Sequence, residues 1–357
     1  MKAVVLEKTE GTPGQVYYPL KATDLPIPTP APTEVVIKIL AAALNHKDLF
    51  CRQHLYPGVD FDIPLFGDGV GIVVAAGTPT LERQWKGKKV VLVPGRGWTS
   101  DPNGPETGNY ATLGGTRFLP NEGTLQEYVA YPAEDIEDAP LHLTNTEAAA
   151  LPLCGLTAYR ATITKGHVTA GQNVLVTGIG GGVALNAMQF AAARGATVFV
   201  TSSSEEKLSK AKELGASAGV NYKVSDWEKQ LAKLLPKSRP YLDAVIDGAG
   251  GEIVNKTSGL LKHGGIIVSY GMTLGPQAPF TIKALLKNIE MRGSTMGSRK
   301  EFADMVDLVR NKQIHPVISH VVNGLNNVDE LFEIMKRGEN FGKLVVTVSD
   351  EGDQAKL

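Results

Sequence analysis

Cysteine, long apolar runs and an excess of one charge are all scarce in this sequence. Two cysteines, Cys51 and Cys154, cannot form a disulfide framework, which favours a reducing compartment. Lys and Arg number 36 and Asp and Glu 37, for a net charge of −1. This balance argues against nucleic-acid or membrane partners held by charge. No stretch approaches the roughly 18 apolar residues of a membrane helix, and the opening MKAVVLEKTE lacks the pattern of a signal peptide.

The last three residues bear on location in the cell. Ala355-Lys356-Leu357 resembles the Ser-Lys-Leu tripeptide that addresses proteins to peroxisomes. A three-residue match is common by chance, and the preceding DEGDQ is acidic. The sequence therefore predicts a cytoplasmic protein, with the peroxisome as the alternative.

The pattern of apolar residues along the chain changes near residue 145. A length of 357 residues favours two domains. Before residue 145, short apolar stretches such as EVVIKILAAAL (34–44) alternate with Pro- and Gly-rich turns, which predicts a β-rich barrel or open sheet. After it, helical stretches such as 145–163 and 182–194 alternate with strands such as TVFVTSS (197–203). Strands that alternate with helices predict a parallel, doubly wound α/β sheet. A helix near 299–311 precedes a return to strands in HPVISHVVNGL and FGKLVVTV.

The stretch NVLVTGIGGGVA (173–184) is the most specific motif. An apolar strand runs into Gly178, Gly180, Gly181 and Gly182, and a helical pattern follows at once. Glycines let the backbone turn tightly and approach a pyrophosphate, while the helix N-terminus offers N–H groups to the phosphates. The motif therefore predicts a dinucleotide-binding site.

The strand after this helix indicates which dinucleotide binds. Proteins that prefer NAD carry an Asp or Glu at the tip of that strand to bind the ribose hydroxyls. Here the strand ends in Thr201, Ser202, Ser203 and Ser204, with Lys207 one helical turn on. Hydroxyls and a lysine suit a 2′-phosphate, so the sequence predicts NADPH (NADP+) rather than NADH.

Several further motifs, in order along the chain, resemble the medium-chain dehydrogenase/reductase superfamily, and in particular its zinc-free quinone oxidoreductase-like branch. They are ALNHKDL (43–49), FGDGVGIV (66–73), ALPLCGLTAYRA (150–161), VTGIGGGVA (176–184), KELGA (212–216) and FGKLVV (341–346). The resemblance extends from residue 1 to about 348. It implies a GroES-like, β-rich catalytic domain at 1–133 and 312–357 and a Rossmann domain with a doubly wound parallel sheet at 134–311.

The resemblance also implies the residues that bind the cofactor. Tyr222 corresponds to a tyrosine that quinone reductases bring to the adenosine phosphate. Thr157, Asn340 and Lys343 match positions that line the phosphates and the nicotinamide. With the motif residues, the predicted cofactor set is Thr157, Gly178, Gly181, Gly182, Val183, Ser202, Ser203, Lys207, Tyr222, Asn340 and Lys343.

Departures from the zinc-dependent members predict a protein without zinc. Those members carry a ligand Cys where this chain has Ala42, and a His-Glu pair where it has Asp68-Gly69. Only Cys154 keeps a ligand position, whereas catalytic zinc needs three protein ligands. The four cysteines of the family's structural zinc are also absent. The remaining alternative is a zinc site rebuilt from Cys51, His54, His46 and Asp68.

Without zinc, an oxidoreductase of this kind is best suited to acceptors that are already electrophilic, such as quinones and α,β-unsaturated carbonyls. By the same resemblance, Asn45 is predicted to donate to the developing oxyanion and Tyr56 to donate or relay a proton. Asp48 is predicted to anchor their loop. His46 and Lys47 add groups that can relay a proton. Trp98 and Tyr110, in the long loop 94–118, either stack on a planar substrate or pin the loop.

The sequence thus predicts an NADPH-dependent, zinc-independent reductase of a quinone or α,β-unsaturated carbonyl. Two alternatives stay open: an aldehyde reductase or alcohol dehydrogenase-like enzyme, and a non-catalytic NADPH-binding protein. An enoyl-thioester reductase becomes more attractive if the peroxisomal tripeptide functions. The expected partner is a small-molecule quinone, enone or aldehyde. The strand NIEMRGSTM (288–296) is predicted to pair across a two-fold axis in a homodimer.

Overall fold

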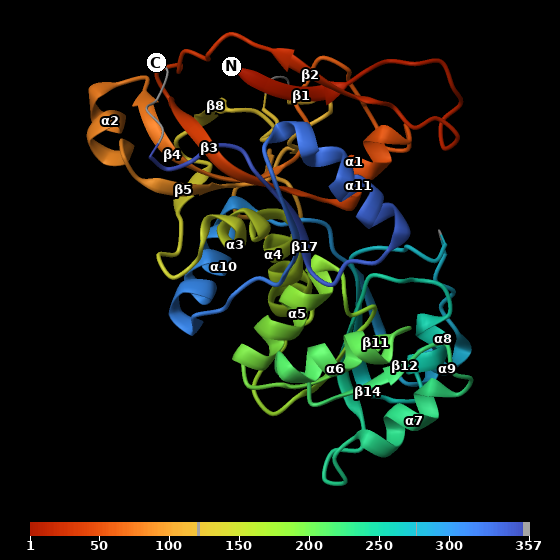
Figure 1. Ribbon diagram of the computed structural model, residues 1–357. Helices are drawn as coiled ribbons and strands as arrows, with labels where there is room; N and C mark the ends of the chain where they lie inside the picture. The colour runs from red at the N-terminus through yellow and green to blue at the C-terminus, as the bar shows by residue number, and fades with distance from the viewer. Residues whose placement is uncertain (120–121, 276, 353–357) are drawn as a thin grey trace. The chain divides into compact units, whose positions relative to one another are not determined.

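The computed structural model describes residues 1–119, 122–275 and 277–352, so the tripeptide Ala355-Lys356-Leu357 lies outside the described residues. The chain divides into two units, which we call the first unit (Met1–Leu153 and Ser298–Leu357) and the second unit (Cys154–Gly297). Each unit is labelled by its elements in Figure 1. None of the described helices is long and apolar enough to cross a membrane.

The first unit is built on a long central strand, β3 (Glu34–Leu44), whose side chains are almost all buried. Its length lets it pair antiparallel with β4 (Asp68–Ala76), β8 (Tyr128–Pro132) and β17 (Lys343–Thr347). The described strands form a seven-stranded sheet in the order β16-β17-β3-β4-β5-β9, with β8 on β3. The remaining strands of this sheet are β5 (Lys89–Leu92), β9 (Ile136–Asp138) and β16 (Ile318–Asn323). The β-rich domain predicted from the sequence is confirmed.

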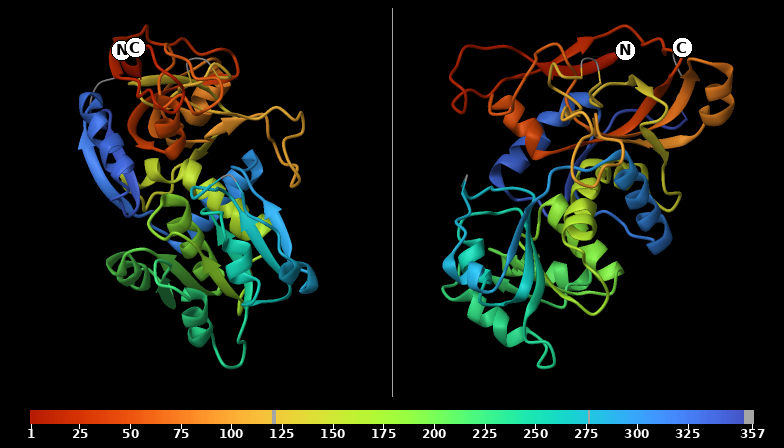
Figure 2. Two further views of the ribbon diagram at one scale, coloured as in Figure 1. Left: turned by 90° about the vertical axis from the view of Figure 1, so that its right-hand side faces the viewer. Right: turned by 180° about the vertical axis from the view of Figure 1, so that it is seen from behind.

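Two hairpins and a set of short helices complete the first unit. The hairpins pair β1 (Lys2–Leu6) with β2 (Leu20–Asp24), and β6 (Gly95–Arg96) with β7 (Ala111–Thr112). The segment between β6 and β7 extends away from the strands of this unit (Figure 2, left). The helices are α1 (His46–Arg52), α2 (Pro79–Trp85), α3 (Asn145–Ala150), α10 (Arg299–Lys312), α11 (Val328–Arg337) and the 3₁₀ turn η2 (Leu325–Asn327).

The second unit is a parallel α/β sheet. Its six strands, among the described residues, run in the order β12-β11-β10-β13-β14-β15 and all pair in parallel. Central strands such as β10 are continuous buried apolar runs because both faces of the sheet are covered by helices. The strands are β10 (Asn173–Val176), β11 (Thr197–Ser202), β12 (Ala218–Asn221), β13 (Leu242–Asp247), β14 (Leu261–Ser269) and β15 (Glu290–Gly293).

The helices of the second unit connect these strands. They are α4 (Pro152–Tyr159, which begins in the first unit), the π-helix η1 (Arg160–Lys165), α5 (Gly182–Ala193), α6 (Glu205–Glu213), α7 (Trp227–Leu234), α8 (Ile253–Thr257) and α9 (Ile282–Leu286). This strand order is that of dinucleotide-binding doubly wound sheets. The predicted Rossmann fold is confirmed.

The structure refines the local predictions in three places. The single helix expected at 145–163 is divided, because α3 ends at Ala150 and Pro152 starts α4, which continues as η1. Helix α11 was not predicted, although its buried residues recur at helical spacing. The units divide at residues 153 and 298, whereas the predicted domain boundaries were 133 and 311. Helices α3 and α10 therefore lie with the first unit.

Candidate active site and cofactor site

The turn between β10 and α5 has the geometry of a phosphate cradle. Gly178 has φ +63° and Gly180 has φ +141°, values that only glycine adopts without strain. The Gly178 N–H donates to Thr201 Oγ1 (3.1 Å), and the Ile179 N–H to the Thr201 carbonyl (2.8 Å), which fixes the turn against β11. A Cβ atom added at Gly178 or Gly181 meets open space. The backbone at these two glycines is therefore not covered by neighbouring atoms, as a close approach of a ligand requires.

The first turn of α5 completes this cradle. Gly181 is the N-cap, and no side chain among the described residues caps the helix. The N–H groups at Gly182 and Val183 are thus not satisfied by a capping side chain, and the positive end of the helix dipole lies beside them. The predicted motif residues come together here as one site.

The residues that were predicted to bind a 2′-phosphate lie together at the end of β11. The Tyr222 N–H donates to the Ser202 carbonyl (2.9 Å), so Tyr222 lies beside Ser202 and Ser203 with its side chain 41% exposed. Ser204 Oγ caps α6 by accepting from the Lys207 N–H (3.3 Å). Burial is the main cause that lowers the pKa of Lys207, on the first turn of α6.

Two carboxylates near this tip have protein partners of their own. Glu205 Oε1 accepts from Asn221 Nδ2 (3.0 Å), and Glu206 Oε1 accepts from Lys210 Nζ (2.6 Å). Each carboxylate is therefore engaged by a neighbouring side chain. The tip itself offers hydroxyls and a lysine, as the sequence indicated.

Sequence reasoning missed Asp247 at the end of β13, beside the β10 turn. Its buried carboxylate accepts from Thr177 Oγ1 (2.6 Å), the Gly250 N–H (2.8 Å) and the Ala249 N–H (3.2 Å). Burial raises its pKa. Asp247 thus fixes the glycine-rich loop that follows β13 against β10. The signal was present in the sequence, because an apolar strand runs into Asp-Gly-Ala-Gly-Gly.

In the first unit, Asn45 and Asp48 form the start of α1. Asn45 is the N-cap, and its N–H donates to Asp48 Oδ2 (2.9 Å) in a capping box. Asn45 Nδ2 donates to Asp68 Oδ2 (2.9 Å), and Asn45 Oδ1 accepts from Lys343 Nζ (2.7 Å). The carboxamide that was predicted to bind the substrate oxyanion is therefore engaged within the protein, and Asp48 has the predicted anchoring role.

Asp68 is the centre of this buried cluster. Its side chain is fully buried, and that of Lys343 is 4% exposed. Lys343 Nζ donates to Asp68 Oδ2 (2.8 Å), Asn45 Oδ1 (2.7 Å) and the Leu44 carbonyl (2.9 Å). Asp68 Oδ1 accepts from the Leu153 N–H (2.7 Å). The ammonium of Lys343, which was predicted to contact the cofactor, is thus engaged by acceptors within the first unit.

Lys47 connects α1 to the segment that follows β7. Its buried Nζ donates to the Gly114 carbonyl (2.9 Å) and to Asp48 Oδ1 (3.2 Å), and lies 5.5 Å from the Tyr56 ring centroid. Burial alone lowers a lysine pKa, but Asp48 and other neighbours outweigh it and raise the pKa of Lys47. The Tyr56 hydroxyl shares a hydrogen bond with Thr112 Oγ1 on β7 (2.9 Å).

The remaining predicted residues have local roles. His46 reaches solvent, but the protein around it and the charge on Lys343 lower its pKa, so its imidazole is neutral at pH 7. Trp98 is buried edge-to-face against Tyr110, with ring centroids 5.9 Å apart, which favours pinning the loop over stacking on a substrate. Thr157 contacts Met296 within the second unit, and Asn340 Nδ2 donates to the Gly342 carbonyl (3.0 Å).

The donors around Asp68 do not fit a catalytic zinc ion. Asn45 Nδ2 donates to Asp68 Oδ2, whereas Ala42, where zinc-dependent members carry a ligand Cys, belongs to the apolar core. An ammonium already holds Asp68 Oδ2. Across the described residues, no group of three or more His, Cys, Asp or Glu side chains is placed to hold a metal ion.

The alternative rebuilt zinc site does not assemble either. His54 Nδ1 is hydrogen-bonded to the Tyr18 hydroxyl (2.5 Å). Burial raises the pKa of the Cys51 thiol to about 12. Asp68 is paired with Lys343.

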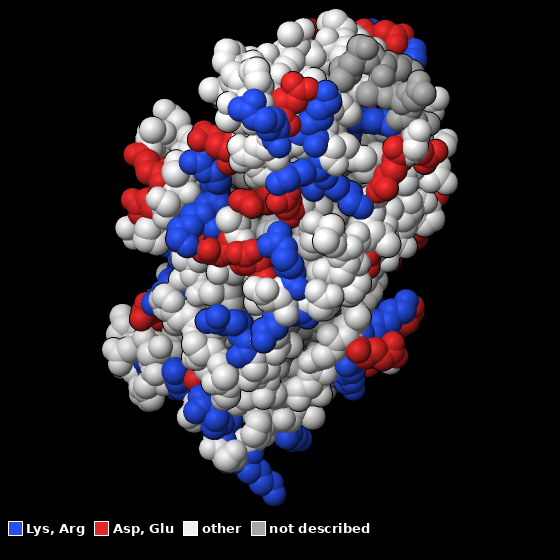
Figure 3. Space-filling model, turned by 90° about the vertical axis from the view of Figure 1, so that its left-hand side faces the viewer, with Lys and Arg blue, Asp and Glu red and all other residues white. Residues whose placement is uncertain are grey.

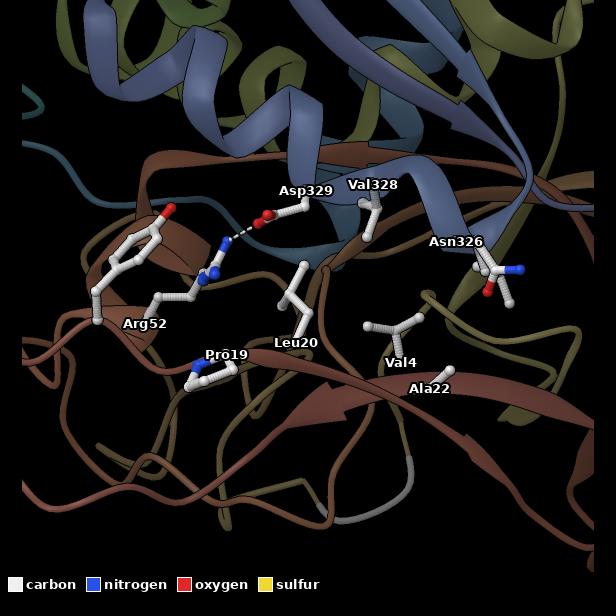
Figure 4. A pocket seen from close by; sticks show the side chains of 10 residues that line it. Val4, Pro19, Leu20, Ala22, Arg52, Asn326, Val328 and Asp329 are labelled. Atoms are coloured by element: carbon white, nitrogen blue, oxygen red, sulfur yellow. Dashed lines mark hydrogen bonds and ion pairs between the residues drawn. The ribbon is translucent and has the colours of Figure 1, made fainter.

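A separate pocket of about 500 Å³ lies in the first unit (Figure 4). Arg52 Nη1 and Asp329 Oδ1 form an ion pair (2.5 Å) on its wall. Its lining residues are Val4, Tyr17, Pro19, Leu20, Ala22, Arg52, Leu325, Asn326, Val328 and Asp329. None of the predicted site residues lines this pocket.

A nucleotide-binding sheet in one unit and a β-rich unit with buried acid–base groups define a two-domain pyridine-nucleotide oxidoreductase. Family models agree: an alcohol dehydrogenase GroES-like domain matches residues 31–140, and a zinc-binding dehydrogenase domain matches residues 182–311. The chain belongs to the zinc-type alcohol dehydrogenase-like proteins of the medium-chain dehydrogenase/reductase superfamily.

Individual relatives support this assignment along the whole chain. A zinc-type alcohol dehydrogenase-like protein, YogA, of Leptosphaeria maculans is 50% identical over 97% of this chain and 99% of its own. An acryloyl-coenzyme A reductase of Sulfurisphaera tokodaii is 28% identical, with 97% and 99% covered. A solved NAD-dependent alcohol dehydrogenase has a TM-score of 0.82 at 31% identity, with 98% and 100% covered.

Proposed function

We propose that the protein is an NADPH-dependent, zinc-independent oxidoreductase that transfers hydride to a quinone or an α,β-unsaturated carbonyl. The observation that carries the proposal is the ammonium of Lys343 on Asp68. Without a Lewis acid, an unactivated alcohol or carbonyl is a poor substrate. An acceptor that is electrophilic in itself needs only orientation and a proton.

The surroundings of Ser203 support the preference for NADPH. Hydroxyls and Lys207 supply donors and a counter-charge for a 2′-phosphate. The two neighbouring carboxylates, Glu205 and Glu206, accept hydrogen bonds from Asn221 and Lys210, respectively. Each carboxylate therefore already binds a protein side chain. NAD-preferring proteins place an Asp or Glu at the end of this strand to bind the ribose. Among the described residues, the end of β11 carries no such carboxylate.

Bound NADPH supplies the hydride. Residues of the chain then handle the charge that develops on the acceptor oxygen. We assign the proton donor as Tyr56, because its hydroxyl shares a hydrogen bond with Thr112 and is not committed to a carboxylate. The Lys47 ammonium, 5.5 Å from the tyrosine ring, stabilises negative charge that forms nearby. Asn45 and Asp48 hold the turn that carries Lys47.

The relatives support an activated alkene as acceptor. Acryloyl-coenzyme A is an α,β-unsaturated thioester, and a reductase named for it covers nearly the whole chain. An alcohol or aldehyde remains the second candidate, because the solved relative at 31% identity is named an alcohol dehydrogenase. The net charge of −1 favours a small-molecule substrate over a polyanion. On the face drawn in Figure 3, basic and acidic side chains are mixed in the upper part.

The deciding experiment is oxidation of NADPH and NADH by metal-stripped protein against quinones, enones, alkenals and simple aldehydes. We expect turnover of quinones or enones with NADPH. Activity lost on chelation and restored by zinc contradicts the zinc-free mechanism. Saturable NADPH binding without turnover of any acceptor identifies a non-catalytic NADPH-binding protein.

We also propose a homodimer formed through the second unit. Strand β15 is the edge of its sheet and pairs only with β14 among the described strands. Apolar side chains nearby in sequence are exposed, namely Phe280, Ile282, Leu285 and Leu286. An open edge beside exposed apolar residues suits a second copy of the chain. Light scattering on the wild type and on Leu286→Glu tests this: the variant is expected to be monomeric.

We propose a cytoplasmic location, with the peroxisome as the alternative. An N-terminal fluorescent fusion with and without Ala355-Lys356-Leu357 tests it. A diffuse signal from both forms is expected. Punctate signal that depends on the tripeptide contradicts the cytoplasmic location.

A further inference from the structure

The pocket of about 500 Å³ in the first unit contains a guanidinium group that the proposed reaction does not use. Its walls come from the β1–β2 hairpin, from the end of α1, and from η2 with the first turn of α11. Arg52 and Asp329 lie at one end of the pocket, and Val4 and Ala22 lie at the other, with Leu20 between them (Figure 4). The pocket is therefore polar at one end and apolar at the other.

Arg52 is buried and fixed in place at the polar end. Its side chain is 4% exposed, and its guanidinium carbon lies over the Tyr17 ring (3.9 Å to the centroid) and the Phe332 ring (4.7 Å). Its Nε donates to the Tyr18 carbonyl (2.9 Å). Contacts with ring faces hold a planar guanidinium while its edges keep their capacity to donate hydrogen bonds.

Most of the hydrogen-bond donors of Arg52 have no acceptor within the described part of the protein. A guanidinium carries five N–H groups. The Tyr18 carbonyl accepts from Nε, and Asp329 Oδ1 accepts from Nη1 (2.5 Å). No described group accepts from Nη2. Because buried donors require acceptors and Arg52 lines the pocket, the remaining N–H groups need an acceptor that enters the pocket.

The charges at the polar end favour a single carboxylate as that acceptor. A carboxylate offers two oxygens to a guanidinium and forms hydrogen bonds that are stronger than those of a neutral group. Asp329 is 62% exposed, so water can solvate it when another acceptor takes its place. A dianionic phosphate would bring two negative charges to one guanidinium beside this carboxylate. The apolar end suits a hydrocarbon chain.

We propose that this pocket is a binding site for a small monocarboxylic acid with an apolar chain, whose carboxylate binds Arg52. The chain lies against the apolar residues Val4, Leu20 and Val328. The volume lies within the range of about 300–1,000 Å³ that is usual for small-ligand sites. The inference goes beyond the proposed function and does not rest on it, because no residue assigned to the cofactor or the acceptor lines the pocket.

The test is calorimetric titration of the full chain with octanoate, without NADPH or an electron acceptor. We expect one saturable site. Acetate lacks the chain, and octylammonium carries the opposite charge, so each should bind at least about 10-fold more weakly than octanoate. A wild type that shows no saturable binding of octanoate overturns the proposal, as does one that binds octylammonium equally tightly.

Two substitutions at the polar end should act in opposite directions. Arg52→Gln removes the guanidinium and should weaken octanoate binding by about 10-fold or more. Asp329→Asn removes the competing carboxylate and should tighten octanoate binding by about 3–10-fold. An ion pair with a structural role alone does not predict this difference in sign. Octanoate binding that Arg52→Gln leaves unchanged, or that Asp329→Asn fails to tighten, overturns the proposal.

Ala22→Phe keeps the proposal testable if Arg52→Gln does not fold. Ala22 is exposed on β2 and lines the apolar end, so a ring at this position fills space that the hydrocarbon chain needs, and octanoate binding should be lost. Thr23→Phe is the matched control, because successive side chains of a strand point to opposite faces and Thr23 is not among the described residues that line the pocket. Equal octanoate binding by Ala22→Phe and the wild type overturns the proposal.

Discussion

The two candidate sites are built in opposite ways. The cofactor turn comes from contiguous chain: β10, residues 177–181 and α5 follow one another directly. The Asp68 cluster joins residues 44, 45, 68, 153 and 343, and the Lys343–Asp68 contact spans 275 positions. One site follows from local backbone geometry and the other from long-range pairing of strands. Substitutions should therefore act differently in the two units.

The largest effect is expected for Asp68→Ala. It leaves the Lys343 ammonium buried without a carboxylate, which should cost about 3–5 kcal/mol of unfolding free energy. Unfolding in denaturant, followed by Trp85 and Trp98 fluorescence in a Trp227→Phe background, reports on the first unit. NADPH binding by the folded second unit should persist. The control is Lys2→Ala, which removes an exposed ion pair with Asp24 and should leave stability unchanged. Equal stability of Asp68→Ala and the wild type contradicts the role of the cluster.

Next in size is Tyr56→Phe. Loss of the proposed proton donor should lower kcat by about 100-fold while leaving the Kd for NADPH unchanged, because the first unit supplies the hydroxyl. Steady-state kinetics with an enone or quinone and fluorescence titration with NADPH separate the two quantities. Tyr241→Phe, in the second unit, should leave kcat unchanged. A Tyr56→Phe variant with wild-type turnover removes Tyr56 from the mechanism.

Ser203→Asp tests the cofactor tip. A carboxylate beside the 2′-phosphate should weaken NADPH binding by about 10–100-fold through repulsion, and leave NADH binding equal or better. Titrations of both cofactors measure the ratio. Ser209→Asp adds the same charge further along α6, where the side chain is exposed, and should change the ratio little. If both variants respond alike, Ser203 is not at the phosphate.

The smallest effect is expected for Gly180→Ala. Its φ of +141° strains any residue with a Cβ, at a cost of about 1–3 kcal/mol. Because the strain is local, NADPH affinity should fall by about 3–10-fold, and the unfolding of the first unit should not change. Gly104→Ala, at a position with open space and no positive φ, is the neutral control. If Gly180→Ala lowers the unfolding free energy of the first unit, the claim that the cofactor turn depends only on local backbone geometry is contradicted.

Local features predicted much of the second unit. The apolar run of β10, the glycines after it and the helical pattern of α5 appear in the order in which they fold, so the turn could be predicted without knowing any distant contact. The serines at the end of β11 were placed correctly for the same reason. Asp247 was missed because its role depends on β13 lying beside β10, which adjacency in sequence does not reveal.

Predictions for the first unit depended on which strands lie side by side. Asn45 was expected to face the substrate, but the pairing of β3 with β4 and β17 brings Asp68 and Lys343 to its carboxamide. The same pairing uses the ammonium that was predicted to reach the cofactor. Helix α11 was overlooked, although its apolar spacing was visible.

By itself, the sequence determined the parallel α/β unit, the β-rich unit and the dinucleotide turn. Each of these follows from residue types within a short window, where backbone geometry and hydrophobic periodicity act. Only the tertiary structure decided that Lys343 provides the cation for Asp68 and that Asn45 is held between them. Hydrogen bonds between residues 45, 68 and 343 depend on strand register, and register is set by the packing of the whole sheet.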